Sequence, residues 1–92
     1  MSQTIQFDQQ TLRLNGDWTA VQVAANWEQL SACEADCLDL VNLKRIDSAG
    51  IAAIITALKP EPSNPLAIKH CTDQAKQLFK LYELEPLLTF EE

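Results

Sequence analysis

A strand-to-helix step in the middle of the chain constrains its fold more than any other feature. Residues 38–43 are mostly apolar, and residues 47–50 (Asp-Ser-Ala-Gly) then lead into a second apolar segment. The isoleucine and leucine residues of 51–58 recur at the spacing of one helix face, which predicts a helix that begins at Ser48 or Ala49. A buried strand that leads directly into a helix is typical of parallel sheets, because parallel strands need a crossover connection. The step therefore predicts an α/β fold.

The rest of the chain alternates strands and helices in the same way. The residue pattern predicts short strands at 5–7 and 11–15, a helix from Thr19, a strand over 37–43, the helix from 48 or 49, a strand at 66–70, a helix capped by Thr72, and a short strand or packed tail at 87–90. Turns are expected at 8–10 and 15–17, and a proline-rich loop at 59–65. No repeat or linker divides residues 1–92, so we predict a single α/β domain, a small mixed β-sheet with three crossover helices.

The first and last predicted helices each carry one apolar face that we expect to pack inward. Thr19 and Gln22 form a capping-box pattern at the start of the first helix. Trp18, just before it, is expected to fill the start of that helix. Trp27 is either a core residue or an exposed aromatic at a partner interface, where large aromatic side chains are common hot spots. The predicted inward residues are Ala20, Val23, Ala24, Trp27, Leu30 and Ser31 in the first helix, and Ala75, Leu78, Phe79 and Tyr82 in the last.

The charge and hydropathy of the chain exclude several classes of partner. The formal net charge is −6, and the Lys and Arg residues form no cluster beyond the pair Lys44-Arg45, which is expected in a solvated turn. Direct binding of nucleic acid or of anionic lipid is therefore not expected. The longest apolar run, residues 51–55, is far shorter than the roughly 20 residues of a membrane helix. With no signal-peptide pattern at residues 1–6, a cytoplasmic location is expected, and any membrane association would be peripheral, through a partner.

The three cysteines predict free thiols and not a disulfide framework or a metal site. A zinc site of Cys33, Cys37, His70 and Cys71 can be drawn, but its spacings match no zinc-ligand pattern. Free thiols in a reducing cytosol are the expected state. His70 is expected to be a structural residue with a satisfied hydrogen bond. We predict no metal and no cofactor.

Ser48 is the main candidate for function, and it has three interpretations. It is an N-cap of the following helix, a contact residue at a partner interface, or a phosphate acceptor. Asp39 and Asp47 form no catalytic constellation, because no nucleophile, histidine or glycine-rich phosphate loop accompanies them. We expect the two carboxylates to orient the Ser48 loop, and we predict no enzyme activity. The predicted partner-binding residues are Asp47, Ser48, Ala49, Gly50, Ile51 and Trp27, with Ser48 the possible phosphorylation site.

The order of three motifs resembles that of the STAS domain family. Residues 14–17 (Leu-Asn-Gly-Asp) lead into the first helix, Asp39-Leu40 lies in the central strand, and residues 47–51 (Asp-Ser-Ala-Gly-Ile) open the second helix. The resemblance covers residues 5–90. Within the family, residues 37–40, 45–50, 26–28 and 80–84 are similar to the short STAS subunits of phospholipid ABC transporters of the Mla type.

The resemblance implies two alternative functions. In the first, the chain has no activity of its own and docks on the cytoplasmic ATPase of an ABC transporter that moves phospholipids and maintains outer-membrane lipid asymmetry. In the second, it is an anti-sigma factor antagonist that works by partner switching, with phosphorylation of Ser48 ending the interaction. Such antagonists usually carry two consecutive hydroxyl residues before the glycine, whereas Ala49 occupies the second place here.

Overall fold

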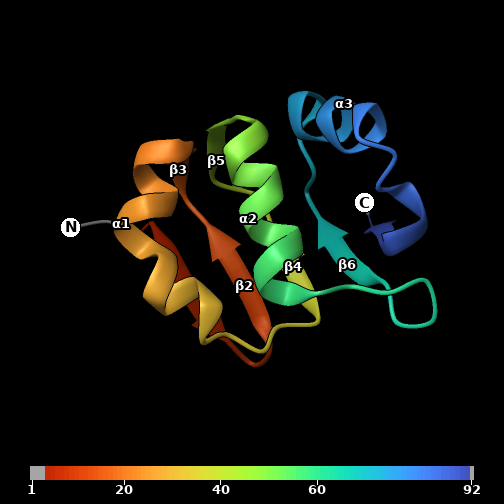
Figure 1. Ribbon diagram of the computed structural model, residues 1–92, viewed down its shortest axis with the longest axis horizontal. Helices are drawn as coiled ribbons and strands as arrows, with labels where there is room; N and C mark the ends of the chain where they lie inside the picture. Colours follow the sequence, from red (N-terminus) through yellow and green to blue (C-terminus); the bar gives the residue numbers. More distant parts are fainter. Residues whose placement is uncertain (1–3, 92) are drawn as a thin grey trace.

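The computed structural model describes residues 4–91. Its helices and most of its strands lie where the sequence predicts them, but the expected turn at 15–17 contains a short strand, and the predicted strand over 37–43 is divided into two. Three helices and seven strands are joined by short connections (Figure 1). In chain order they are β1 (Ile5–Asp8), β2 (Thr11–Leu14), β3 (Gly16–Trp18), α1 (Ala20–Ser31), β4 (Cys37–Asp39), β5 (Leu43–Ile46), α2 (Ser48–Leu58), β6 (Leu66–Lys69), α3 (Asp73–Leu81), a 3₁₀ turn (Glu85–Leu87) and β7 (Leu88–Glu91).

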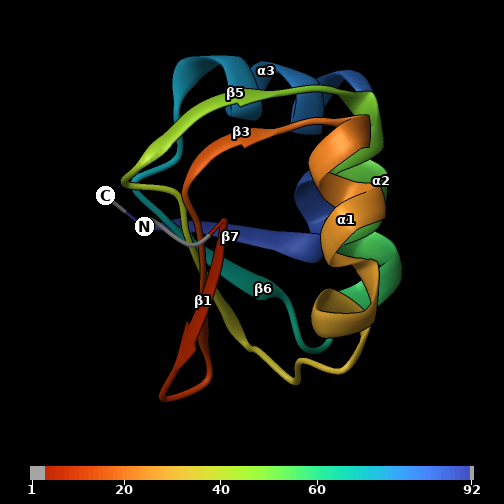
Figure 2. The same cartoon turned by 90° about the vertical axis from the view of Figure 1, so that its left-hand side faces the viewer.

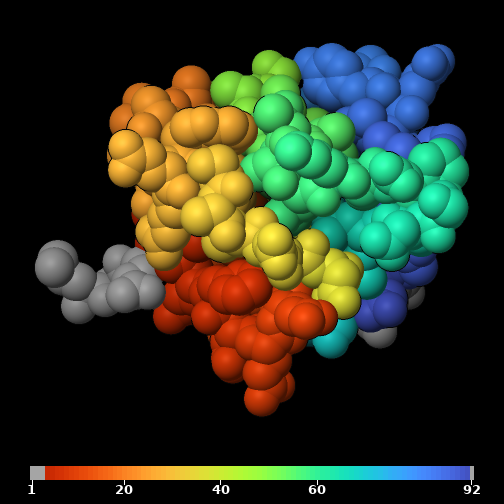
Figure 3. Space-filling view, turned by 60° about the horizontal axis from the view of Figure 1, so that its bottom comes forward, coloured from red at the N-terminus to blue at the C-terminus, as the bar shows by residue number. Residues whose placement is uncertain are grey.

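The main sheet is mixed and its helices lie on one side, as predicted for an α/β domain. Its five strands run in the order β1-β2-β4-β6-β7, with β1 antiparallel to β2 and every other pair parallel. Figure 2 shows α1 and α2 side by side against one face of this sheet, with α3 at its end over β5. The β1–β2 hairpin projects below the two helices in the space-filling view (Figure 3). The opposite face of the sheet has no helix over it in residues 4–91.

The predicted strand over residues 37–43 is wrong, because the chain turns within it. β4 ends at Asp39, whose carboxylate accepts a hydrogen bond from the Val41 N–H at 3.0 Å, and the Leu43 N–H donates to the Leu40 carbonyl. β5 then pairs with β3 in a separate two-stranded parallel sheet. The pair Lys44-Arg45 therefore lies in a strand and not in a solvated turn.

A similar turn, at Gly16, separates β2 from β3. Gly16 has a φ of +72°, in the left-handed region that glycine adopts without a Cβ penalty. Its N–H donates to the carbonyl of Asn42 at 2.9 Å, which joins the two turns across the molecule. On the two strands that follow, the Arg45 guanidinium lies 2.8 Å from the Asp17 carboxylate. The two turns take the chain out of the main sheet and into β3 and β5, and β5 leads directly into α2.

The hydrophobic core lies between the sheet and the helices. Register places Leu12, Leu38, Ile68 and Phe90 in one row of adjacent strands, on the side that faces the helices. The largest side chains with no more than about 2% exposure include Trp18, Ile54 and Phe79. The ring centroids of Phe79 and Phe90 are 6.1 Å apart, so α3 packs over β7.

The predicted inward faces of α1 and α3 are too wide. In α1 only Leu30 is fully buried and Val23 is half-buried, whereas Ala20, Ala24, Trp27 and Ser31 are exposed. Tyr82, predicted as core, follows the last residue of α3 and is 47% exposed. The reason is position in the layer, because α1 lies at its edge, with α2 on one flank and no helix of residues 4–91 on the other. A helix at the edge of a layer buries fewer residues than the apolar spacing of its sequence predicts.

Candidate partner-binding site

The start of α2 is fixed by Asp47 and not by Ser48. One oxygen of the Asp47 carboxylate accepts a hydrogen bond from the Gly50 N–H at 2.9 Å, so Asp47 is the N-cap. The other oxygen accepts from the Ala20 N–H at 3.3 Å, at the start of α1. The interpretation of Ser48 as N-cap is therefore wrong, because Ser48 is the first residue inside the helix. Asp47 thus joins the first turns of two helices, and the Ser48 side chain makes no hydrogen bond with any residue of 4–91.

Gly50 allows the first turn of α2 to lie directly on Trp18. The Trp18 Nε1–H donates to the Gly50 carbonyl at 3.1 Å, and the indole is fully buried. A Cβ at position 50 would lie 2.3 Å from the backbone oxygen of Trp18 and 2.8 Å from its ring, closer than such contacts allow. Trp18 thus supports the start of α2, a role that its position before α1 does not reveal.

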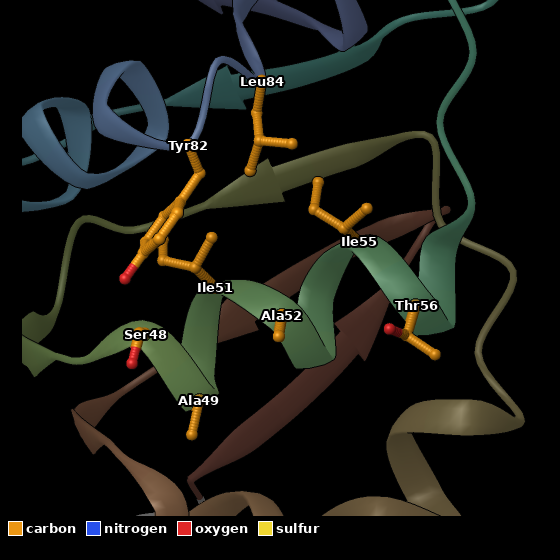
Figure 4. Close-up of a pocket in the computed structure, with 8 residues that line it drawn as sticks. All are labelled: Ser48, Ala49, Ile51, Ala52, Ile55, Thr56, Tyr82 and Leu84. Carbon is orange, nitrogen blue, oxygen red and sulfur yellow. The ribbon is translucent and has the colours of Figure 1, made fainter.

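An apolar hollow of about 590 Å³ lies over the exposed side of α2 (Figure 4). Tyr82 and Leu84 form one wall, and in Figure 4 the Tyr82 ring leans toward Ile51 while Leu84 points toward Ile55. Ser48 and Thr56 place a hydroxyl near each end of the helical wall. The lining residues are Ser48, Ala49, Ile51, Ala52, Ile55, Thr56, Tyr82 and Leu84.

A second hollow, of about 620 Å³, adjoins the first between the start of α2 and α3. Ser48 and Tyr82 line both hollows, so we treat them together as the α2–α3 groove. Leu81 lies in its second part and is 68% exposed. The remaining lining residues of this part are Ile46, Asp47, Gln74, Gln77 and Leu78. The groove is therefore an apolar surface with the Ser48 hydroxyl near its middle.

The chain matches a known family over nearly its whole length. Residues 1–89 match the family described as "Mlab, STAS domain". The chain belongs to this STAS family. No curated protein matches it. The arrangement of a small mixed sheet with three helices agrees with this assignment.

The STAS domain brings most of the predicted site residues together. Ser48, Ala49 and Ile51 line the first hollow and Asp47 lines the second, while Gly50 is buried beneath them. The exception is Trp27, which lies on α1, is 38% exposed and lines neither hollow. Its interpretation as a core residue is therefore wrong.

Sequence reasoning missed the rest of the groove. Ala52, Ile55 and Thr56 follow Ser48 at offsets of four, seven and eight residues, so helical spacing alone could have found them. Tyr82 and Leu84 had no such signal, because only the packing of α3 beside α2 brings them to Ser48.

Asp39 does not orient the Ser48 loop, contrary to the prediction. Its oxygens lie 3.2 Å from Arg13 and 3.0 Å from His70 Nδ1, in addition to the bond from Val41. Burial alone would raise the pKa of Asp39, but the hydrogen bonds with His70, the Val41 N–H and Arg13 hold that pKa below its usual value. His70 has its predicted hydrogen-bond partner, although it is an exposed residue. The cluster lies on the sheet face away from the groove.

The cysteines of the STAS domain are free thiols. Cys37 is buried, and Cys33 and Cys71 are half-buried. Burial raises the pKa of Cys71 to about 11, so this thiol is protonated at neutral pH. Within residues 4–91, no three His, Cys, Asp or Glu side chains converge as a metal site would require. None of the helices in that range is long and apolar enough to cross a membrane.

Proposed function

We propose that this STAS domain is a non-catalytic cytoplasmic subunit that docks on the ATPase of an ABC phospholipid transporter, peripheral to the inner membrane. The transporter would maintain the lipid asymmetry of the outer membrane. The α2–α3 groove is the observation that carries the proposal, because it is an open apolar surface built around the step that defines the family resemblance. The proposed contact residues are Asp47, Ser48, Ala49, Gly50, Ile51 and Trp27, to which the groove adds Ile55, Leu81, Tyr82 and Leu84.

The chemistry of the groove fits a protein partner. α2 carries no charged residue over its whole length, and its exposed side presents alanine, isoleucine and hydroxyl groups. Tyr82 and Leu81, both exposed, supply large apolar side chains at the rim. Aromatic anchors in apolar surroundings are the usual hot spots of interfaces. Trp27, exposed on the neighbouring helix, would extend the contact beyond the groove.

Docking can affect an ATPase in two ways without any chemistry in the docked subunit. Binding to the folded ATPase stabilises it by mass action. Binding one conformation of its catalytic cycle better than another shifts the population toward that conformation. Gly50 and Asp47 would contribute indirectly, because they hold the first turn of α2 in place.

The alternative function is that of an anti-sigma factor antagonist, and the exposure of Ser48 favours it. Within residues 4–91 the Ser48 hydroxyl has no hydrogen-bond partner, and it lies in the first turn of α2. A phosphate there would sit at the positive end of the helix but next to the Asp47 carboxylate. Its charge of about −2 in the middle of an apolar groove would expel a partner.

The two functions are separated by capture of partners from native cells. The tagged chain would be purified in mild detergent and its partners identified by mass spectrometry. We expect an ABC ATPase with its permease, and we expect Ser48→Glu to lose both. Ser63→Glu, which adds the same charge on the exposed 59–65 loop, is the matched control and should retain them. Recovery of a serine kinase without a transporter would overturn the transporter proposal and support the alternative.

A further inference from the structure

The face of the main sheet that no helix of residues 4–91 covers carries a row of charges that alternate in sign. We call it the open face. Strand register places Arg13 beside Asp39, Asp39 beside Lys69, and Lys69 beside Glu91. Residues paired in register point to the same face of a sheet, and the alternating residues Leu12, Leu38 and Ile68 are buried on the other face. The four charges therefore run positive, negative, positive, negative across β2, β4, β6 and β7. We call them the charge row.

The face that carries the charge row is unusual for parallel strands. Parallel sheets normally have both faces covered, whereas here α1 and α2 cover one face and no helix in the described part of the chain covers the other (Figure 2). A shallow hollow of about 230 Å³ lies on the open face and is lined by polar residues of β1, β2, β4 and β6. A polar, uncovered parallel face fits a partner of complementary charge.

The order of signs in the charge row makes it complementary to itself. When a two-fold axis passes between β4 and β6, a second copy places its Glu91 over Arg13 and its Lys69 over Asp39. The same two contacts recur on the other side of the axis, as in any isologous interface. We propose that the open sheet face binds a second copy of this chain through the charge row.

Existing contacts within the chain show which of these pairs decides the interaction. Asp39 is buried and already accepts hydrogen bonds from the Val41 N–H and Arg13, with His70 Nδ1 also at 3.0 Å. Lys69 and Glu91 are exposed and have no ion pair with any residue of 4–91. Glu91 is therefore available to Arg13 of the second copy, and this outer pair should dominate.

The size of the face predicts a weak and transient dimer. Five strands about 4.8 Å apart and about 13 Å long give roughly 300 Å² per copy, or roughly 600 Å² in total. This is below the area of about 1,200 Å² of stable complexes, so self-association is expected only at high chain concentration. The open face lies opposite α1 and α2, so a dimer leaves the α2–α3 groove accessible, and the inference does not depend on the proposed function.

Charge reversal gives a test that a general loss of folding cannot imitate. Arg13→Glu places two negative charges opposite each other in a homodimer, and Glu91→Arg places two positive charges opposite each other. A mixture of the two variants restores opposite charges at both outer contacts of a heterodimer. We expect each variant alone to associate at least about tenfold more weakly than the natural chain, and the mixture to associate at least as well as the natural chain.

The measurement is sedimentation equilibrium at chain concentrations up to about 2 mM, in about 0.1 M salt, where the Debye length is about 10 Å. Concentration-dependent amide shifts in the NMR spectrum would locate the contact. Glu91→Arg changes the net charge from −6 to −4 (−6 + 2), so long-range repulsion alone would strengthen its association. Lys44→Glu is the charge-matched control for Arg13→Glu. Both substitutions change the net charge to −8 (−6 − 2), but Lys44 is on β5, away from the charge row.

Each outcome decides the proposal. It is supported if the natural chain and Lys44→Glu self-associate, both row variants lose the interaction, and the mixture regains it with shifts on β2, β4, β6 and β7. It is overturned if the natural chain stays monomeric over the whole range. It is also overturned if the mixture associates no better than its components, or if the shifts fall on the groove.

Discussion

The two faces of this STAS domain have opposite surface chemistry. On the helical side, the α2–α3 groove is formed by a helix without charged residues and by the exposed side chains of Leu81 and Tyr82. On the open side, paired strands present the alternating charges of the charge row. An apolar surface binds through buried area, whereas a charged surface binds through pairs that salt screens. One small domain thus offers two surfaces whose interactions respond to different conditions.

The largest expected effect comes from breaking the support of the groove at Gly50. In Gly50→Val the new side chain meets the backbone oxygen of Trp18, which cannot move aside easily. Overpacking of this kind costs about 1–3 kcal/mol or more, and each 1 kcal/mol lowers the Tm of a domain of this size by about 4–8 °C. We expect a fall of about 10 °C or more in thermal unfolding followed by circular dichroism.

The control for Gly50→Val is Ala52→Val, two residues further along α2 at an exposed position. It places the same valine side chain on α2 without the contact with Trp18, and although valine has a lower helix propensity than alanine, it should lower the Tm by less than about 4 °C. An equal fall in both variants would mean that the contact between Gly50 and Trp18 does not determine the stability of this region.

The contrast between the faces predicts a difference in salt dependence. When salt rises from about 0.05 M to about 0.5 M, the Debye length falls from about 14 Å to about 4 Å. We expect self-association through the charge row to weaken about tenfold, and binding of the ATPase through the groove to change less than about threefold. Sedimentation equilibrium and titration calorimetry measure the two. Equal salt dependence of the two affinities would contradict the assignment of self-association to the charge row and of ATPase binding to the apolar groove.

The exposed aromatic side chain outside the groove should matter less than those within it. Trp27 lies on α1, lines neither hollow and is 38% exposed, so at the edge of a contact Trp27→Ala should weaken ATPase binding by about fivefold or less. Calorimetric titration of the purified ATPase gives this number. A loss above about 100-fold would move the centre of the interface from the groove to α1.

The sequence predicts the three helices and the strands of the main sheet, but not the second sheet of β3 and β5, because the former depend on local pattern. The helix from Ser48, the strand at 66–70 and the cap at Thr72 follow from spacing and capping chemistry, and the structure confirms them. The break of the central strand at Asp39 could not be predicted in this way. It depends on the pairing of β5 with β3, which lies far back in the chain, and on the bond from Gly16 to Asn42.

The candidate site was predicted only in part for the same reason. Residues 47–51 share one helical turn, so their juxtaposition follows from the sequence. Tyr82 and Leu84 are more than 30 residues away in the chain, and an apolar pattern at the end of α3 predicts a core position for Tyr82. Whether that residue is covered depends on what packs beyond α3, and in residues 4–91 no element lies there.

The smallest expected effect concerns pH and the open face. The pKa of Asp39 in the folded chain is below the ordinary value of 3.8. The stability that this shift contributes is therefore complete only above about pH 5, where the carboxyl is ionised in the unfolded chain as well, and it is lost as the pH falls through the folded pKa. We expect the difference in the free energy of unfolding between the natural chain and Asp39→Asn to shrink from pH 5 toward pH 3. Urea denaturation measures it, and a difference that grows as pH falls would contradict the sign.

Docking through the α2–α3 groove is tested most directly by calorimetric titration of the transporter ATPase with the natural chain and with Tyr82→Ala. Tyr82 lines both parts of the groove and is not needed for the core, so the variant should unfold at the same temperature. We expect Tyr82→Ala to lose about 2 kcal/mol or more of binding free energy, which is about 30-fold in affinity. Unchanged affinity in a folded variant would contradict the claim that the α2–α3 groove is the docking surface.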